Sequence, residues 1–110
     1  MHGITPEMER CIQNCQDCHN ICLNMATNHC LKIGGAHVEQ NHFRLMMDCA
    51  QICQASADFM LRNSPHHTKT CAACVDVCTD CANSCENVGD MEKCVVACRK
   101  CAESCRQMAA

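Results

Sequence analysis

The sequence predicts an all-α protein, an antiparallel up-down-up-down four-helix bundle with a core lined by cysteine. Cysteine, methionine and histidine recur at spacings of three and four residues, which is the repeat of helices that pack along one face. Val and Ile are few and do not alternate with polar residues, so a sheet is disfavoured. The 110 residues suffice for one domain.

Proline and glycine divide the chain into four helical segments. Thr5-Pro6 and Ser64-Pro65 each read as an N-cap residue followed by proline at the start of a helix. Glycines follow the first and third segments, and Asp90 is the expected N-cap of the fourth. The predicted helices cover about 6–33, 38–62, 65–87 and 91–107, within a single domain of residues 1–110.

The composition restricts both the core and the location of the protein. There is no Trp or Tyr, and the 48% of apolar residues includes 16 Cys and 8 Met, so thiols must fill much of the interior. A net charge of −3 with scattered Lys and Arg argues against binding to nucleic acid. No apolar run approaches the roughly 20 residues that cross a membrane. Because the N-terminus has neither the basic nor the apolar region of a secretion signal, we expect a cytoplasmic protein with reduced thiols.

Cysteine occupies the positions where an ordinary bundle places leucine. All the cysteines except Cys30 fall on the repeat, and Cys30 lies one residue past it, after His29. Isolated buried cysteines are common, but this number on four helices indicates a shared function. The predicted metal ligands are Cys11, Cys15, Cys18, Cys22, Cys30, Cys49, Cys53, Cys71, Cys74, Cys78, Cys81, Cys85, Cys94, Cys98, Cys101 and Cys105.

Most of these cysteines form C-x3-C pairs, such as Cys74 and Cys78. On a helix such residues have Cβ atoms roughly 5–6 Å apart, so two sulfurs can converge to roughly 4–5 Å. One two-coordinate ion with bonds of about 2.3 Å fits between them. Thiolates select Cu(I), and one Cu(I) per thiolate cancels the buried charge. We therefore expect multiple Cu(I) ions, roughly one per cysteine.

Methionine and histidine lie towards the ends of the segments as candidate accessory ligands for copper uptake. One set is Met8, Met60, His67 and Met108, and the other is Met25, His29, His42, Met46 and Met91. Within the second set, we expect His29 and His42 to face each other beside Met46 and Cys30. The remaining histidines, His37 among them, are off the repeat or terminal and are predicted to have no metal role.

Other functions account for less of the pattern. His67-x3-Cys71-x2-Cys74 resembles the zinc motif of zinc-binding anti-sigma factors, which would make the protein a zinc-dependent redox-regulatory bundle. Further cysteines continue the same repeat, so this match is incidental. General detoxification of Ag(I), Cd(II) or Hg(II) by the same thiols stays open. The chain has no nucleophile–base constellation and no Gly-rich phosphate loop, so we do not expect an enzyme.

The runs CIQNCQDCHNIC, DCAQIC, CAACVDVCTDCANSC and CVVACRKCAESC resemble the copper storage proteins over about residues 7–110. The N-terminus is similar to that of the cytosolic bacterial branch of the family. The resemblance implies a four-helix bundle whose core thiolates store many Cu(I) ions. It also implies a homotetramer that exchanges copper with donor or acceptor proteins. The second segment carries only Cys49 and Cys53, which leaves the copper capacity near His42 and Met46 undefined.

Overall fold

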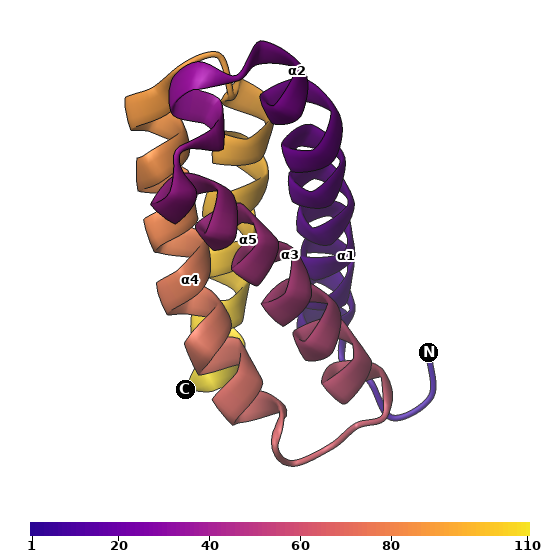
Figure 1. Cartoon of the computed structure of the whole chain (residues 1–110). Helices are drawn as coiled ribbons and strands as arrows, with labels where there is room; N and C mark the ends of the chain where they lie inside the picture. The colour runs from indigo at the N-terminus through magenta and orange to yellow at the C-terminus, as the bar shows by residue number, and fades with distance from the viewer.

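The computed structural model describes residues 1–110 and contains four long helices that alternate in direction (Figure 1). These are α1 (Pro6–Asn24), α3 (Gln40–Leu61), α4 (His67–Val88) and α5 (Glu92–Ala109). Around the bundle, α1 packs against α3 and α5, and α4 packs against the same two helices. The molecule is 45 Å long and 21 × 18 Å across. The predicted all-α four-helix bundle is confirmed.

The first helix begins where the sequence indicates. The hydroxyl of Thr5 accepts a hydrogen bond from the backbone N–H of Met8 at 3.2 Å, and Pro6 occupies the first turn. Glu7 and Glu9 place negative charge beside the free N–H groups of this turn. Cap, proline and acidic turn together fix the register of α1, and with it the face that carries its cysteines.

The end of the first segment differs from the continuous helix expected over 6–33. A π-helical turn, Met25–Cys30, follows α1, and the short α2 (Leu31–Ile33) and a 3₁₀ turn (Gly35–Val38) lead into α3. A π turn holds more residues than an α turn and rotates the chain that follows it. Ala26 and Cys30 are consequently buried, while His29 is half-buried. This insertion explains why Cys30 faces the core although it lies one residue off the repeat.

The other three helices start slightly later than the sequence indicates. The carboxylate of Glu39 accepts from the backbone N–H of Asn41 at 2.7 Å, which places the start of α3 at Gln40. A turn at Pro65 delays α4 to His67. The expected N-cap role of Asp90 is wrong, because this residue has a left-handed backbone, φ 57°, and the cap position falls on Met91.

The core consists mainly of sulfur-bearing and small side chains. All 16 cysteines have no exposed surface, and Met46, Met60 and Met91 are at most 1% exposed. Six alanines fill the space between them, namely Ala26, Ala50, Ala57, Ala82, Ala97 and Ala102. No helix is long and apolar enough to span a lipid bilayer.

Ser56 interrupts this core with a hydroxyl that is fully buried and has no hydrogen-bond partner. An unpaired buried hydroxyl is costly, so Ser56→Ala should raise the free energy of unfolding of the metal-free protein by about 1 kcal/mol. The control is Ser104→Ala, because the Ser104 hydroxyl donates to the carbonyl of Lys100 and accepts from Asn14, both at 3.2 Å. Urea unfolding under reducing conditions should order the variants S56A, wild type, S104A from most to least stable. An S56A protein no more stable than S104A would contradict the assignment.

Candidate metal centre

Eleven of the core thiols form one unbroken series of sulfur contacts, which we name the thiol column. It begins between Cys11 and Cys105, whose sulfurs are 3.7 Å apart, and ends between Cys22 and Cys98, at 3.6 Å. Every intermediate step joins sulfurs at 3.5 to 4.0 Å. All four long helices contribute, with Cys11, Cys15, Cys18, Cys22, Cys49, Cys53, Cys74, Cys78, Cys98, Cys101 and Cys105.

Groups of four thiols within this column lie close enough to share an ion. In each group the sulfurs are within 4.8 Å of one another, and several cysteines belong to more than one group. The groups are Cys15/Cys74/Cys101/Cys105, Cys53/Cys74/Cys78/Cys101, Cys18/Cys49/Cys53/Cys78 and Cys18/Cys22/Cys49/Cys98, with Cys11/Cys71/Cys105 as a group of three. Shared members favour bridging thiolates over isolated tetrahedral sites.

The contacts between helices are as close as those within one helix. Within C-x3-C pairs the sulfurs are 3.5 Å apart in Cys74–Cys78 and 3.8 Å in Cys18–Cys22. Across helices, Cys15 and Cys101 are also 3.5 Å apart. The Cys74–Cys78 and Cys18–Cys22 pairs are closer than the 4–5 Å expected from the sequence, and the Cys101–Cys105 pair, at 4.0 Å, agrees with it. Two bonds of about 2.3 Å across such distances enclose an angle of about 100–110°, so a linear ion requires the side chains to rotate apart.

Burial disfavours thiolates in the metal-free column, while hydrogen bonds between thiols raise the pKa of some members and lower that of others, such as Cys74, whose main partner is Cys101. The pKa of Cys53 is raised, first because it is hydrogen-bonded with Cys101 and other thiols, and further because burial disfavours the thiolate. The pKa of Cys22 is raised in the same way, with Cys18 as the main partner, and that of Cys105 with Cys101. Burial favours the neutral form of these thiols, which can then pack as small apolar groups.

At the end of the bundle that holds α2 and the α4–α5 connection, a different set of donors surrounds Cys30 (Figure 1). The Cys30 sulfur is 3.7 Å from the Met46 sulfur and 3.8 Å from the Met91 sulfur. Its third neighbour is Nδ1 of His37, at 3.7 Å. His37, which the sequence places off the repeat, is buried, and its ring contacts a core thiol.

His29 and His42 do not meet, contrary to expectation. Nε2 of His29 donates to the carbonyl of Asp90 at 3.0 Å and lies 3.6 Å from its carboxylate, so this ring ties the π turn to the α4–α5 connection. Nδ1 of His42 is hydrogen-bonded with the Ser84 hydroxyl at 2.7 Å. Nε2 of His42 is buried without a partner, which leaves it available as a ligand.

The proposed zinc motif is not assembled. Nδ1 of His67 donates to the carbonyl of Ser64 at 2.7 Å and caps the turn before α4. Cys71 groups with Cys11 and Cys105, whereas Cys74 lies in the thiol column. His67 thus lies outside the thiol groups, whereas Cys71 and Cys74 belong to two groups that share Cys105.

The remaining methionines are distributed over both ends. The Met60 sulfur lies 3.9 Å from the Cys71 sulfur, so a thioether does adjoin the thiols at the end opposite Cys30. Met8 is buried and Met108 half-buried against the core. Met25 is half-buried against the core and also lines a surface hollow together with Lys93.

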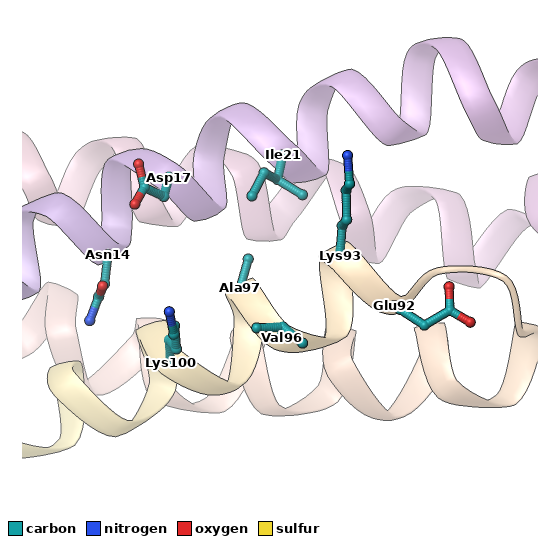
Figure 2. A pocket seen from close by; sticks show the side chains of 8 residues that line it. All are labelled: Asn14, Asp17, Ile21, Glu92, Lys93, Val96, Ala97 and Lys100. Atoms are coloured by element: carbon teal, nitrogen blue, oxygen red, sulfur yellow. The ribbon is translucent and has the colours of Figure 1, made fainter.

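A hollow on the outer surface between α1 and α5 carries no thiol. Figure 2 shows Ile21 and Ala97 pointing into the space between the two helices. Asp17, Lys93 and Lys100 are among the charged residues around it. Its mixed, exposed lining offers none of the soft donors found inside the bundle, so the chemistry of this protein lies in the core.

A four-helix bundle whose core is a column of shared thiols belongs to the class of proteins that hold many soft metal ions. The family model of the copper storage proteins matches residues 4–110 of the chain. The chain belongs to this family, as the sequence motifs indicate, and it is a storage protein rather than an enzyme.

Similar proteins agree with this assignment. The chain is 52% identical to the Nmul_A1745 protein of Nitrosospira multiformis, with 94% of each chain covered and a TM-score of 0.92. It is 36% identical to the Cu(I)-bound copper storage protein BsCsp3, over 94% of this chain and 99% of that one, with a TM-score of 0.86. Over 77 residues, 70% of each chain, it is 36% identical to the uncharacterized cysteine-rich protein YhjQ of Bacillus subtilis (strain 168).

Proposed function

We propose that the protein stores Cu(I) along the thiol column and the adjoining cysteines, at roughly one ion per cysteine. The observation that carries this proposal is the unbroken series of sulfur contacts from Cys11 to Cys98, to which all four long helices contribute. A copper chaperone needs a single exposed pair of thiols. A buried series of shared thiols suits the retention of many ions.

Charge balance decides which ion the column holds. A buried thiolate is unfavourable unless its charge is neutralised, and a monovalent ion that replaces each proton leaves the core neutral. A tetrahedral zinc ion takes four thiolates, and four thiolates around one Zn(II) would leave a net charge of −2 buried in the core. Loading with Cu(I) should release about one proton per ion.

Anaerobic titration of the reduced protein with Cu(I), against a competing chelator, tests this proposal. Uptake should continue to about sixteen equivalents per chain, with growing ultraviolet absorbance from copper–thiolate bonds. A pH-stat should record about one proton released per ion. Saturation at one or two equivalents would contradict storage and favour the regulatory zinc bundle instead.

We further propose that the protein acts in the cytosol, because sixteen thiols held as a metal store must stay reduced. The ligand set is proposed to include all 16 cysteines, with the histidines and methionines at the two ends as accessory ligands. The family resemblance supports a homotetramer and exchange of copper with donor or acceptor proteins. Light scattering of the purified protein tests the tetramer, since a monomeric mass would contradict it.

A further inference from the structure

We propose that Cys11 and Cys105 form a reversible disulfide when hydrogen peroxide reaches the metal-free protein, and that this bond closes one end of the thiol column to copper. The two cysteines lie on α1 and α5, with their sulfurs 3.7 Å apart. Formation of the bond does not depend on the storage of copper, whereas its effect on copper uptake rests on that proposed function.

Only cysteines on different helices can be joined within this core. A disulfide needs Cβ atoms about 3.5–4.5 Å apart, and residues three or four apart on one helix have Cβ atoms roughly 5–6 Å apart. The sulfurs of Cys74 and Cys78 are 3.5 Å apart, yet both lie on α4, so a bond between them would distort the helix. Cys11 and Cys105 meet from separate helices, where this limit does not apply.

The two helices are held together beside this pair. The side chain of Asn14 on α1 donates to the hydroxyl of Ser104 on α5 at 3.2 Å, and Ser104 directly precedes Cys105. This hydrogen bond fixes the rotation of α5 relative to α1 at the level of the pair. Closing the two sulfurs from 3.7 Å to about 2.0 Å therefore takes side-chain rotation and a small approach of the helices.

The position of the pair at the end of the thiol column makes it accessible to peroxide. Met8 lies one helical turn before Cys11 and is 9% exposed, and Met108 lies one turn after Cys105 and is half-buried. Local opening of the bundle is needed for any metal ion to enter this buried core. Hydrogen peroxide is small and uncharged, so the same openings admit it, and at this end it meets Cys11 and Cys105 before the rest of the column.

The reaction consumes one hydrogen peroxide for each bond. The Cys11 sulfur attacks one peroxide oxygen and the O–O bond breaks, which gives a sulfenic acid and one water. The Cys105 sulfur then attacks the Cys11 sulfur, the S–O bond breaks, and a second water leaves with the thiol proton. Two thiols thereby lose two electrons and two protons, and the peroxide becomes two waters. A dithiol reductant reverses the bond by thiol–disulfide exchange.

The disulfide changes both the capacity and the chemical fate of the core. Cys105 belongs to the group of three thiols that contains Cys11 and also to one of the groups of four. A sulfur in a disulfide no longer carries the negative charge that binds Cu(I), so both groups lose a ligand. The bond also keeps these two sulfurs from irreversible oxidation to sulfinic acid. Reduction then returns the column to its full set of thiols.

Peptide mass spectrometry of the full chain tests the bond. The reduced, metal-free protein is treated with about one equivalent of hydrogen peroxide, and the remaining thiols are alkylated before digestion. Fragment spectra should assign a single disulfide between Cys11 and Cys105, and dithiothreitol should restore all 16 thiols. A bond within one helix, such as Cys74–Cys78, or a bond of Cys105 to Cys15 in place of Cys11, would overturn the assignment.

Two single variants separate the pair from its neighbour. Cys11→Ala and Cys71→Ala each remove a fully buried thiol of the same group of three, so the cavities are comparable. Cys71→Ala should form the disulfide as wild type does, whereas Cys11→Ala should lose thiols to peroxide roughly tenfold more slowly. Equal rates of thiol loss in the two variants would contradict the proposal.

Copper titration of the oxidised protein tests the closure of the column. After removal of peroxide, oxidised wild type should bind about two or three fewer Cu(I) ions than reduced wild type. The reduced sample is the control, and an unchanged capacity after oxidation would refute the closure. Failure of storage itself is distinguishable, because the reduced protein would then saturate at one or two equivalents even though the disulfide forms.

Discussion

Above pH 9 the metal-free protein should lose its stability within roughly two pH units, while the copper-loaded protein stays folded. The thiols of Cys22, Cys53 and Cys105 have pKa values raised above the ordinary 9.0 by hydrogen bonds with neighbouring thiols and by burial. Below pH 9 both the folded and the unfolded chain keep these protons, so stability is complete. Between pH 9 and the raised pKa values only the unfolded chain releases them, and stability falls.

The size of this effect follows from the number of thiols. Each thiol that ionises only in the unfolded chain removes about 1.4 kcal/mol per pH unit, so these three alone remove about 4 kcal/mol per unit. A small domain has about 5–15 kcal/mol in total. Circular dichroism of the reduced protein between pH 7 and 11, under argon, should show loss of helix above pH 9. The loaded protein is the control, because its sulfurs have no proton to lose.

A metal-free protein that remained as stable at pH 10.5 as at pH 7 would contradict this account. It would mean that the unfolded chain gains nothing by ionising, and hence that the folded core already contains thiolates. In that case metal loading would release far fewer protons than ions, which the pH-stat measurement would show independently.

Much of this molecule could be predicted from the spacing of its cysteines. Residues three and four apart share a helix face, and a buried face full of thiols leaves little choice of architecture or ligand. The N-cap at Thr5 could also be predicted, because the Thr5 hydroxyl bonds to the nearby backbone of Met8 and the next residue is proline.

The Cys30 group could not be predicted in the same way. No residue pattern reliably predicts a π turn, so the burial of Cys30 could not be predicted from the sequence. The spacing of three and four residues alone predicts that His29 faces the core and that His37 lies off the repeat. The one available signal was the Gly34-Gly35 pair, whose positive φ angles fold the chain back and bring His37 over Cys30. The side-chain partners of His42 and His67 likewise depend on tertiary contacts and local turns.

Replacing both cysteines of α3 should reduce copper capacity by more than the two thiols removed. Cys49 and Cys53 are the only thiols that α3 contributes, yet together they belong to three of the groups of four thiols. The Cys49 sulfur is 3.6 Å from that of Cys78, and the Cys53 sulfur is 3.6 Å from that of Cys101. Each thiolate that bridges two ions is a ligand to both. The Cys49→Ala/Cys53→Ala protein should therefore bind about four fewer Cu(I) ions than wild type.

The matched control is Cys85→Ala/Cys94→Ala. Both cysteines are as fully buried as the α3 pair, and neither belongs to a group of thiols that could share an ion. The two double variants create cavities of the same size, so a difference between them reports metal binding and not packing. The control should lose about two ions. Titrations against the same chelator measure both. Equal losses would show that the cysteines act as independent ligands, and that the column is a row of separate sites rather than a shared cluster.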